Sequence, residues 1–166
     1  MIATGMSIIK NKGRDEGPTG GRLMIAYGMN MVQRNLPYGA RRVDSLILRD
    51  WKLVFSTHAT LEREHGAECG AVLWEINLDC EQAMDCREGV RYEDPDLGYY
   101  RREIVRLDDG REALVYLMNY DHANRQDSRD HTSSYYIRML QVGHKKAGLP
   151  QALLDRALEG VTVSCW

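Results

Sequence analysis

A glutamate at the end of a short predicted helix is the side chain best placed for proton transfer. The segment Met84-Asp85-Cys86-Arg87-Glu88-Gly89-Val90 closes a helix predicted over residues 80–87. Glu88 falls at its C-terminal end, where the helix dipole disfavours a carboxylate. A carboxyl group buried there would have a raised pKa, which suits proton transfer near neutral pH. The alternative is a solvated Glu88 that pairs with Arg87 or Arg91.

The segment Ala26-Tyr27-Gly28-Met29-Asn30 predicts an anion-binding turn. It follows the apolar run Leu23–Tyr27, which is typical of a buried strand that ends at Gly28. Backbone N–H groups just beyond a strand end no longer pair within the sheet, so they can bind a carboxylate or phosphate. An ordinary turn gives the same pattern, so both interpretations stay open here.

A tyrosine-bearing helix is predicted after Thr132 or Ser133, either of which can cap it. Tyr136, Leu140, Gly143 and Ala147 recur at four-three-four spacing, which places them on one helix face. A glycine inside a helix costs about 1 kcal/mol relative to alanine, so another segment is expected to approach the backbone of Gly143 closely. A capped amphipathic helix explains this pattern without any site.

The elements that must position these residues are mostly strands, followed by helices. Asp79 is expected to cap the helix over 80–87, Gly89 to end it, and Pro150 to begin a last helix. Because no strand–helix–strand alternation is present, the order favours an α+β fold with a mainly antiparallel sheet or small β-barrel and a few flanking helices. Further strands are predicted at 45–55, 70–78, 99–107 and 112–120, the last two joined by the hairpin signal Asp108-Asp109-Gly110.

Length and composition indicate one globular domain. The chain has 166 residues, 43% of them hydrophobic and 28% charged, with a net charge of −2. We expect a flexible arm over residues 1–21, rich in charge, glycine and proline, and a single domain over 22–166. No apolar run is long enough to span a bilayer, and no basic excess points to nucleic acid. Four cysteines without a C-x-x-C pair, and no secretory leader, predict a reduced cytoplasmic protein: Cys69, Cys80, Cys86 and Cys165.

Taken in order, the motifs resemble those of the γ-glutamylcyclotransferase-like family. The family pattern has Y-G-S-N, then L-x-x-W/F-x-L-x-F, V-x-G-V-L/V-W and L-D-x-x-E-G, and closes on P-S-x-x-Y with G-A-x-x-x-G-L-P. The resemblance covers residues 23–158. The matching segments here are Tyr27-Gly28-Met29-Asn30, Leu48 to Phe55, Cys69 to Trp74, Met84 to Val90, Gly98 to Arg102, Tyr116 to Met118, Thr132 to Tyr136 and Gly143 to Pro150.

The resemblance implies a small mixed barrel with a pocket at one mouth, in which a γ-glutamyl group cyclises to 5-oxoproline and releases an amine or amino acid. Glu88 matches the family's general acid/base, and the reaction needs no metal or cofactor. The residues implied to bind substrate are Ile25, Ala26, Tyr27, Gly28, Met29, Asn30, Tyr100 and Tyr136. The implied partner is a small γ-glutamyl molecule, not a nucleic acid or a membrane, and a homodimer stays open.

This chain departs from the family pattern at several positions. Met29 replaces the family serine, Thr132 the proline, and Ala71 a usual glycine. Met29 leaves open an inactive small-molecule-binding protein of the same fold. The longer acidic segment Arg91–Leu97 is either a surface insertion or a lid that selects an unusual amide.

One further cluster has residue types that could coordinate a metal ion. His58, Glu62 and His65 would share a helix face, but Gly66 and the preceding strand favour a loop, so no metal site is expected.

Overall fold

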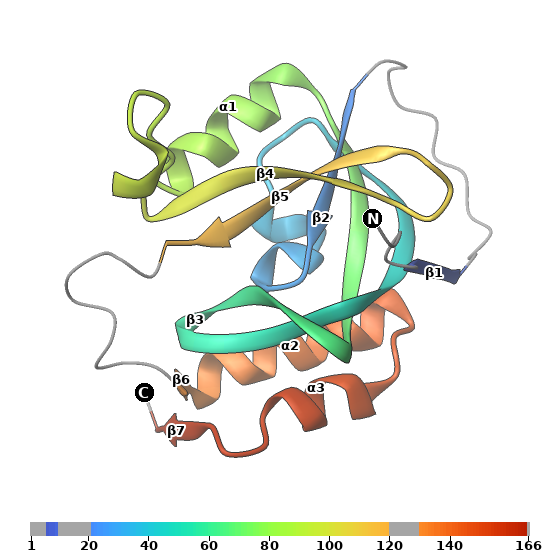
Figure 1. The fold of residues 1–166 in the computed structure, drawn as a ribbon, viewed down its shortest axis with the longest axis vertical. Coiled ribbons are helices and arrows are strands. Elements are labelled where there is room, and N and C mark those ends of the chain that lie inside the picture. The colour runs from blue at the N-terminus through green and yellow to red at the C-terminus, as the bar shows by residue number, and fades with distance from the viewer. Residues whose placement is uncertain (1–5, 10–20, 120–129, 166) are drawn as a thin grey trace.

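The computed structural model describes residues 6–9, 21–119 and 130–165 as a mixed α+β fold (Figure 1). Seven strands among these residues form one sheet in the order β4-β5-β2-β3-β6-β7, with β1 paired to β3. The pairs β1–β3, β2–β3 and β4–β5 are antiparallel, whereas β2–β5, β3–β6 and β6–β7 are parallel. The predicted α+β class with a mainly antiparallel sheet is therefore confirmed.

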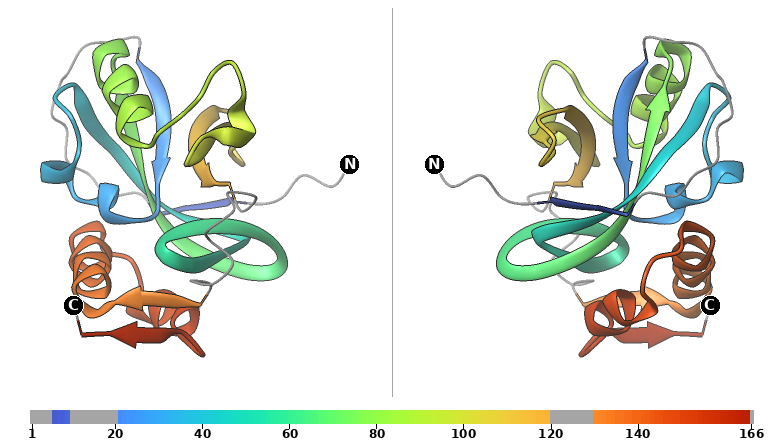
Figure 2. Two further views of the ribbon diagram at one scale, coloured as in Figure 1. Left: turned by 90° about the vertical axis from the view of Figure 1, so that its left-hand side faces the viewer. Right: turned by 90° about the vertical axis from the view of Figure 1, so that its right-hand side faces the viewer.

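The element bounds are as follows. The strands are β1 Met6–Ile9, β2 Arg22–Ala26, β3 Ala40–Ile76, β4 Tyr100–Arg106, β5 Glu112–Met118, β6 His131–Ser133 and β7 Thr162–Ser164. The helices are α1 Leu78–Arg87, α2 Ser134–Ala147 and α3 Gln151–Ala157, with 3-10 turns at Met29–Met31, Gln33–Asn35 and Pro95–Leu97. Figure 2 shows α1 at one end of the molecule and α2 with α3 at the other, where β6 and β7 also lie, with most of the sheet between the two ends.

The long strand β3 doubles back on itself as a hairpin. Near its open end Arg41 pairs with Glu75, and further along Lys52 Nζ lies 3.1 Å from Glu64 Oε1. These contacts centre the hairpin near residue 58, and Thr57 just before it has a φ of 64°. The strands predicted at 45–55 and 70–78 are thus the two arms of this hairpin.

Two apolar clusters, one on each side of β2, form the core. Ile25 packs in one cluster with Leu73 and Val115, whereas Met24 packs in the other with Leu114. Successive side chains of a strand point to opposite faces, so both faces of β2 are buried. This explains why the sequence of β2 after its first residue is a continuous run of apolar residues and does not alternate between apolar and polar residues.

Helix α2 packs closely on the 3-10 turn Met29–Met31. Ser133 caps the helix, its hydroxyl oxygen accepting from the Tyr136 N–H at 3.1 Å. A Cβ at Gly143 would lie 3.1 Å from the Met31 Cβ, so the predicted close approach at Gly143 is confirmed. The glycine therefore lets the turn Met29–Met31 pack close against the helix.

Three local predictions differ from the structure. Asn77, not Asp79, caps α1, since its Oδ1 accepts from the Cys80 N–H at 2.9 Å. Residues 58–66 belong to β3 and not to a loop, because the hairpin extends further than the glycine signal suggested. Within the predicted arm, Met6–Ile9 pair with β3 as a strand, while residues 1–5 and 10–20 lie outside the described residues.

No helix among the described residues is long and apolar enough to span a bilayer.

Candidate active site

A pocket of about 770 Å³ opens where β2, α1, β4, α2 and the tip of the β3 hairpin meet. All nine residues that the sequence singled out as catalytic or substrate-binding line it. They are Ile25, Ala26, Tyr27, Gly28, Met29, Asn30, Glu88, Tyr100 and Tyr136. Residues from four separate parts of the chain are thus brought together around one cavity, which we call the site pocket.

The main chain on both sides of Glu88 fixes its position. The residue follows α1 directly, and its N–H donates to the Met84 carbonyl at 2.8 Å. Its carbonyl accepts from the Tyr100 N–H at 3.1 Å, which ties the end of α1 to the start of β4. Gly89 then turns the chain away with a φ of 66°, a conformation that glycine adopts without strain. The Glu-Gly pair therefore fixes the point at which the side chain of Glu88 leaves the main chain.

A short relay of hydrogen bonds orients the Glu88 carboxyl group. Asn30 Nδ2 donates to Glu88 Oε1 at 3.0 Å, and Arg87 Nη2 donates to Asn30 Oδ1 at 2.9 Å. Because Arg87 holds the amide oxygen, the amide nitrogen of Asn30 faces Glu88. The expected alternative, a solvated Glu88 paired with Arg87 or Arg91, does not occur among the described residues.

Burial raises the pKa of Glu88, and the Asn30 hydrogen bond and the Arg87 charge offset only part of that rise. A carboxyl group with a raised pKa binds and releases a proton closer to neutral pH than an ordinary glutamate. The relay keeps the group ionisable, while burial keeps its proton affinity high. This combination is suited to general acid/base chemistry.

Two tyrosine hydroxyls are held by a single residue at the hairpin tip of β3. The Ala59 N–H donates to Tyr136 Oη at 3.1 Å, and Tyr100 Oη donates to the Ala59 carbonyl at 2.9 Å. Burial raises the pKa of Tyr136 to about 12 and that of Tyr100 well above its usual range. Both hydroxyls therefore stay protonated near neutral pH and can orient a ligand, but they do not act as bases.

The turn after β2 passes directly beneath the Tyr136 hydroxyl. A Cβ at Gly28 would lie 2.9 Å from Tyr136 Oη, so a side chain at this position would have to displace the tyrosine hydroxyl. The backbone of the turn thus reaches the pocket wall closely, which is what an anion-binding turn requires. Met29 is half-buried in the same wall, where the family pattern has serine.

Sequence reasoning missed several residues that line the site pocket. His58 and Tyr99 form part of its mouth, with His58 Nδ1 3.2 Å from the Tyr99 hydroxyl. Arg34 and Tyr116 also line it. Tyr116 lies in a quoted motif, and that motif was the available signal. Neither His58 nor Arg34 has a local pattern that marks it, because their placement depends on the hairpin and on the 3-10 turn.

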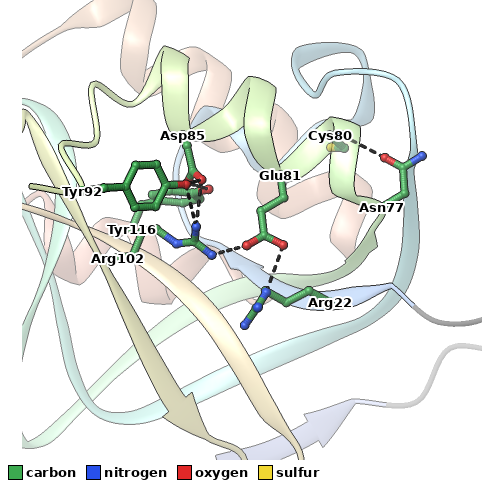
Figure 3. A network of polar contacts seen from close by, with 8 residues as sticks. All are labelled: Arg22, Asn77, Cys80, Glu81, Asp85, Tyr92, Arg102 and Tyr116. Carbon is green, nitrogen blue, oxygen red and sulfur yellow. Dashed lines mark hydrogen bonds and ion pairs between the residues drawn. The ribbon is translucent and has the colours of Figure 1, made fainter.

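Beside the pocket, two carboxylates of α1 form a network of polar contacts with side chains of neighbouring elements, shown in Figure 3. Arg102 pairs with Glu81 and, at 2.8 Å, with Asp85. We call this group, made of Arg22, Glu81, Asp85, Tyr92, Arg102 and Tyr116, the arginine–carboxylate network. It reaches the pocket wall through Tyr116, whose hydroxyl donates to Asp85 Oδ1 at 2.7 Å.

The insertion Arg91–Leu97 does not cover the site pocket. Its residues are exposed, and none of them lines the cavity. Tyr92 instead donates its hydroxyl to Asp85, and the Pro95 carbonyl accepts from Asn119 Nδ2 at 2.7 Å. The insertion is thus fastened to the outer side of α1 and to the end of β5, away from the position expected of a lid.

No cluster of three or more His, Cys, Asp or Glu side chains that could hold a metal ion is found within residues 6–9, 21–119 and 130–165.

No protein-family model matches the sequence, and no curated protein matches it significantly. Solved structures do match. A γ-glutamyl cyclotransferase superposes with a TM-score of 0.65 at 24% identity, covering 89% of this chain and 91% of that one. An uncharacterized protein from Homo sapiens gives 0.66 at 23% identity, covering 88% and 90%. YkqA from Bacillus subtilis gives 0.57 at 18% identity, covering 88% of this chain and 57% of that one.

These matches show that the chain has the γ-glutamylcyclotransferase-like fold. The fold resemblance inferred from the sequence motifs is therefore confirmed over nearly the whole chain.

Proposed function

We propose that the protein is a γ-glutamylcyclotransferase-type enzyme that converts a γ-glutamyl amide into 5-oxoproline and a free amine or amino acid. The observation that carries the proposal is the Glu88 carboxyl group. It lines a pocket, has a raised pKa and is oriented by Asn30. The fold shared with a γ-glutamyl cyclotransferase supports the same conclusion.

The proposed reaction is an intramolecular acyl transfer. The α-amine of the glutamyl group attacks the γ-carbonyl carbon, and the Glu88 carboxylate accepts the proton that the amine loses. The tetrahedral intermediate then collapses, the C–N bond to the leaving group breaks, and Glu88 returns the proton to the departing nitrogen. Because nucleophile and electrophile belong to one molecule, holding the substrate folded supplies much of the rate enhancement.

The turn Tyr27–Asn30 is proposed to hold the substrate's α-carboxylate or the developing oxyanion through its backbone amides. The methionine at position 29 removes a side-chain hydroxyl relative to the family pattern, but it does not change the backbone donors. Tyr100 and Tyr136, which stay protonated, are proposed to orient the substrate. This chemistry assigns no role to a metal or an organic cofactor.

The experiment that tests the proposal measures 5-oxoproline release from a panel of γ-glutamyl amides by mass spectrometry. Glu88→Gln is expected to lower the rate by about 10²–10⁴, the usual contribution of a general acid/base. Glu93→Gln is the matched control, because Glu93 is exposed on the insertion and does not line the pocket. Equal rates for wild type and Glu88→Gln would contradict the proposed role of Glu88.

A second candidate function rests on Met29, which places a thioether in the pocket wall where the family pattern has a small hydroxyl side chain. In that case the protein binds a small molecule without converting it. The same panel separates the two candidates, since binding seen by calorimetry without any 5-oxoproline release in the wild type supports the second.

A further inference from the structure

Arg34 is a cation on the wall of the site pocket whose charge is left unneutralised. It lies in the 3-10 turn Gln33–Asn35, and its side chain is exposed at the pocket. Its guanidinium Nη2 lies 3.6 Å from Met139 Sδ, and sulfur is a weak acceptor. Within the part of the chain that the structure describes, no carboxylate lies within ion-pair distance of it. Its N–H donors therefore remain available to a ligand.

The second arginine of the pocket wall differs in this respect. Arg87 donates to the Asn35 carbonyl at 2.6 Å and to Asn30 Oδ1 at 2.9 Å, and it also contacts Met84 Sδ. Its donors are committed to the protein, which makes it a structural residue that orients Asn30. Arg34 is therefore the cation of the pocket wall that is suited to meet a ligand.

The turn that carries Arg34 is fastened to the reacting end of the pocket. Asn35 Nδ2 donates to the Met29 carbonyl at 2.7 Å, which folds the segment back onto the turn after β2. The Arg87 contact to the Asn35 carbonyl then joins the same segment to the end of α1, beside Glu88. Arg34 thus occupies a defined place at the pocket rim, a few residues from the groups that surround the reaction centre.

We propose that Arg34 is a specificity-determining residue that binds a carboxylate on the departing amine and so favours γ-glutamyl compounds whose leaving group carries one over otherwise equal compounds that lack it. This inference rests on the proposed function. In that function the turn Tyr27–Asn30 and Glu88 hold the glutamyl end, which leaves the leaving group toward the rim. A guanidinium there matches a carboxylate in both charge and geometry, since it can donate two parallel hydrogen bonds.

The test uses two compounds that differ by a single carboxylate, γ-L-glutamyl-L-alanine and γ-L-glutamylethylamide. Their dissociation constants are measured by calorimetry in the Glu88→Gln background, where the proposed reaction is slowed by about 10²–10⁴ and consumes little of either compound during a titration. We expect the alanine compound to bind about tenfold more tightly, as a charge-assisted contact at a partly exposed site allows. In Glu88→Gln/Arg34→Gln the two constants are expected to become equal. Arg106→Gln is the matched control, since Arg106 lies on β4 outside the pocket lining and only 3.9 Å from the exposed Glu112.

A preference that is absent before the Arg34 change, or that survives it, would overturn the inference. A preference that Arg106→Gln abolishes as fully as Arg34→Gln would also overturn it, because a general charge effect would then explain the result. Release of 5-oxoproline by the wild type is measured separately. Its absence overturns the proposed function, while the binding constants still report whether Arg34 recognises the carboxylate.

Discussion

Helix α1 carries carboxylates in two contrasting settings. On the side that faces β4, Glu81 and Asp85 are only 8% and 4% exposed, and each is paired with Arg102. Just past the C-terminal end, Glu88 is half-buried, and its one hydrogen-bond donor among the described side chains is the neutral amide of Asn30. One turn of helix therefore separates a neutralised pair from a carboxyl group without a counter-charge in direct contact.

The difference shows how one helix serves both stability and chemistry. Where a guanidinium lies against a buried carboxylate, the desolvation of both groups is offset and the pair fastens α1 to β4. Where an uncharged amide takes the place of the guanidinium, the carboxyl group keeps a raised proton affinity. Four variants change one setting or the other.

The largest effect is expected from Arg102→Met, which leaves Glu81 and Asp85 buried without their shared partner. We expect the free energy of unfolding to fall by about 3 kcal/mol, the lower end for a broken buried pair, because Arg22 still contacts Glu81 at 3.0 Å. Urea denaturation measures the change. Arg106→Met, on the same strand but beside the exposed Glu112, is expected to change stability little. Equal losses of unfolding free energy in the two variants would show that the arginine–carboxylate network stabilises the fold no more than an exposed ion pair does.

The next effect is expected from Asn30→Leu, which removes the hydrogen bond that Glu88 accepts. This bond lowers the pKa of Glu88, so its loss raises that pKa further. Since Glu88 must be ionised to accept a proton, the acid limb of kcat/KM moves to higher pH, and activity on that limb falls by about tenfold. Asn30→Asp adds a like charge and is expected to move the limb in the same direction. An unchanged limb in both variants would mean that Asn30 does not control Glu88.

A smaller effect is expected from Tyr92→Phe, at the edge of the arginine–carboxylate network. The variant removes a hydroxyl that donates to Asp85 and accepts from Arg102 Nη1 at 2.9 Å. We expect a loss of about 1 kcal/mol in the free energy of unfolding. The control is Tyr38→Phe, at a tyrosine that is 98% exposed, and it should cost almost nothing. Activity should be unchanged in Tyr92→Phe, because the insertion does not line the pocket.

The smallest effect concerns stability and pH at Glu88 itself. Burial raises its folded-state pKa, so the folded state binds the proton more tightly than the unfolded state does. The stabilisation is fully present below the unfolded pKa and is lost as the pH rises through the folded pKa. Glu88→Gln, which resembles the protonated form, should therefore be more stable than wild type at neutral pH by less than about 1 kcal/mol, with no difference near pH 4. The opposite trend in urea midpoints would contradict a buried carboxyl group.

Much of the fold could be predicted from local signals. The run Leu23–Tyr27, the Asp-Gly hairpin between β4 and β5, and the cap and glycines around α2 each have a short-range physical cause. Their positions in the structure follow the prediction closely. The short strands β6 and β7 were missed, because three-residue strands depend on a neighbour to pair with and have no periodicity of their own.

Residues that line the pocket were predicted where a motif lies on one continuous segment, as at Glu88 and at the turn Tyr27–Asn30. Lining residues were missed where their position depends on distant partners. Arg34 reaches the pocket only because Asn35 and Arg87 fold its segment back, and His58 only because β3 turns at its midpoint. Likewise, Asn77 caps the helix in place of Asp79, two residues further on, because both are good capping residues and local preference does not decide between them.

The contacts at Ala59 have a consequence for how this pocket can change. Both tyrosine hydroxyls are held there by main-chain atoms, so replacing the Ala59 side chain removes neither bond. Inserting or deleting a single residue at the tip of the β3 hairpin would disturb these two hydrogen bonds far more. Strand residues alternate between faces, so such a slip would turn both backbone groups away from the cavity and release the two rings together. Ligand preference can thus vary through changes in the surrounding side chains, while the length of the β3 hairpin has to stay fixed.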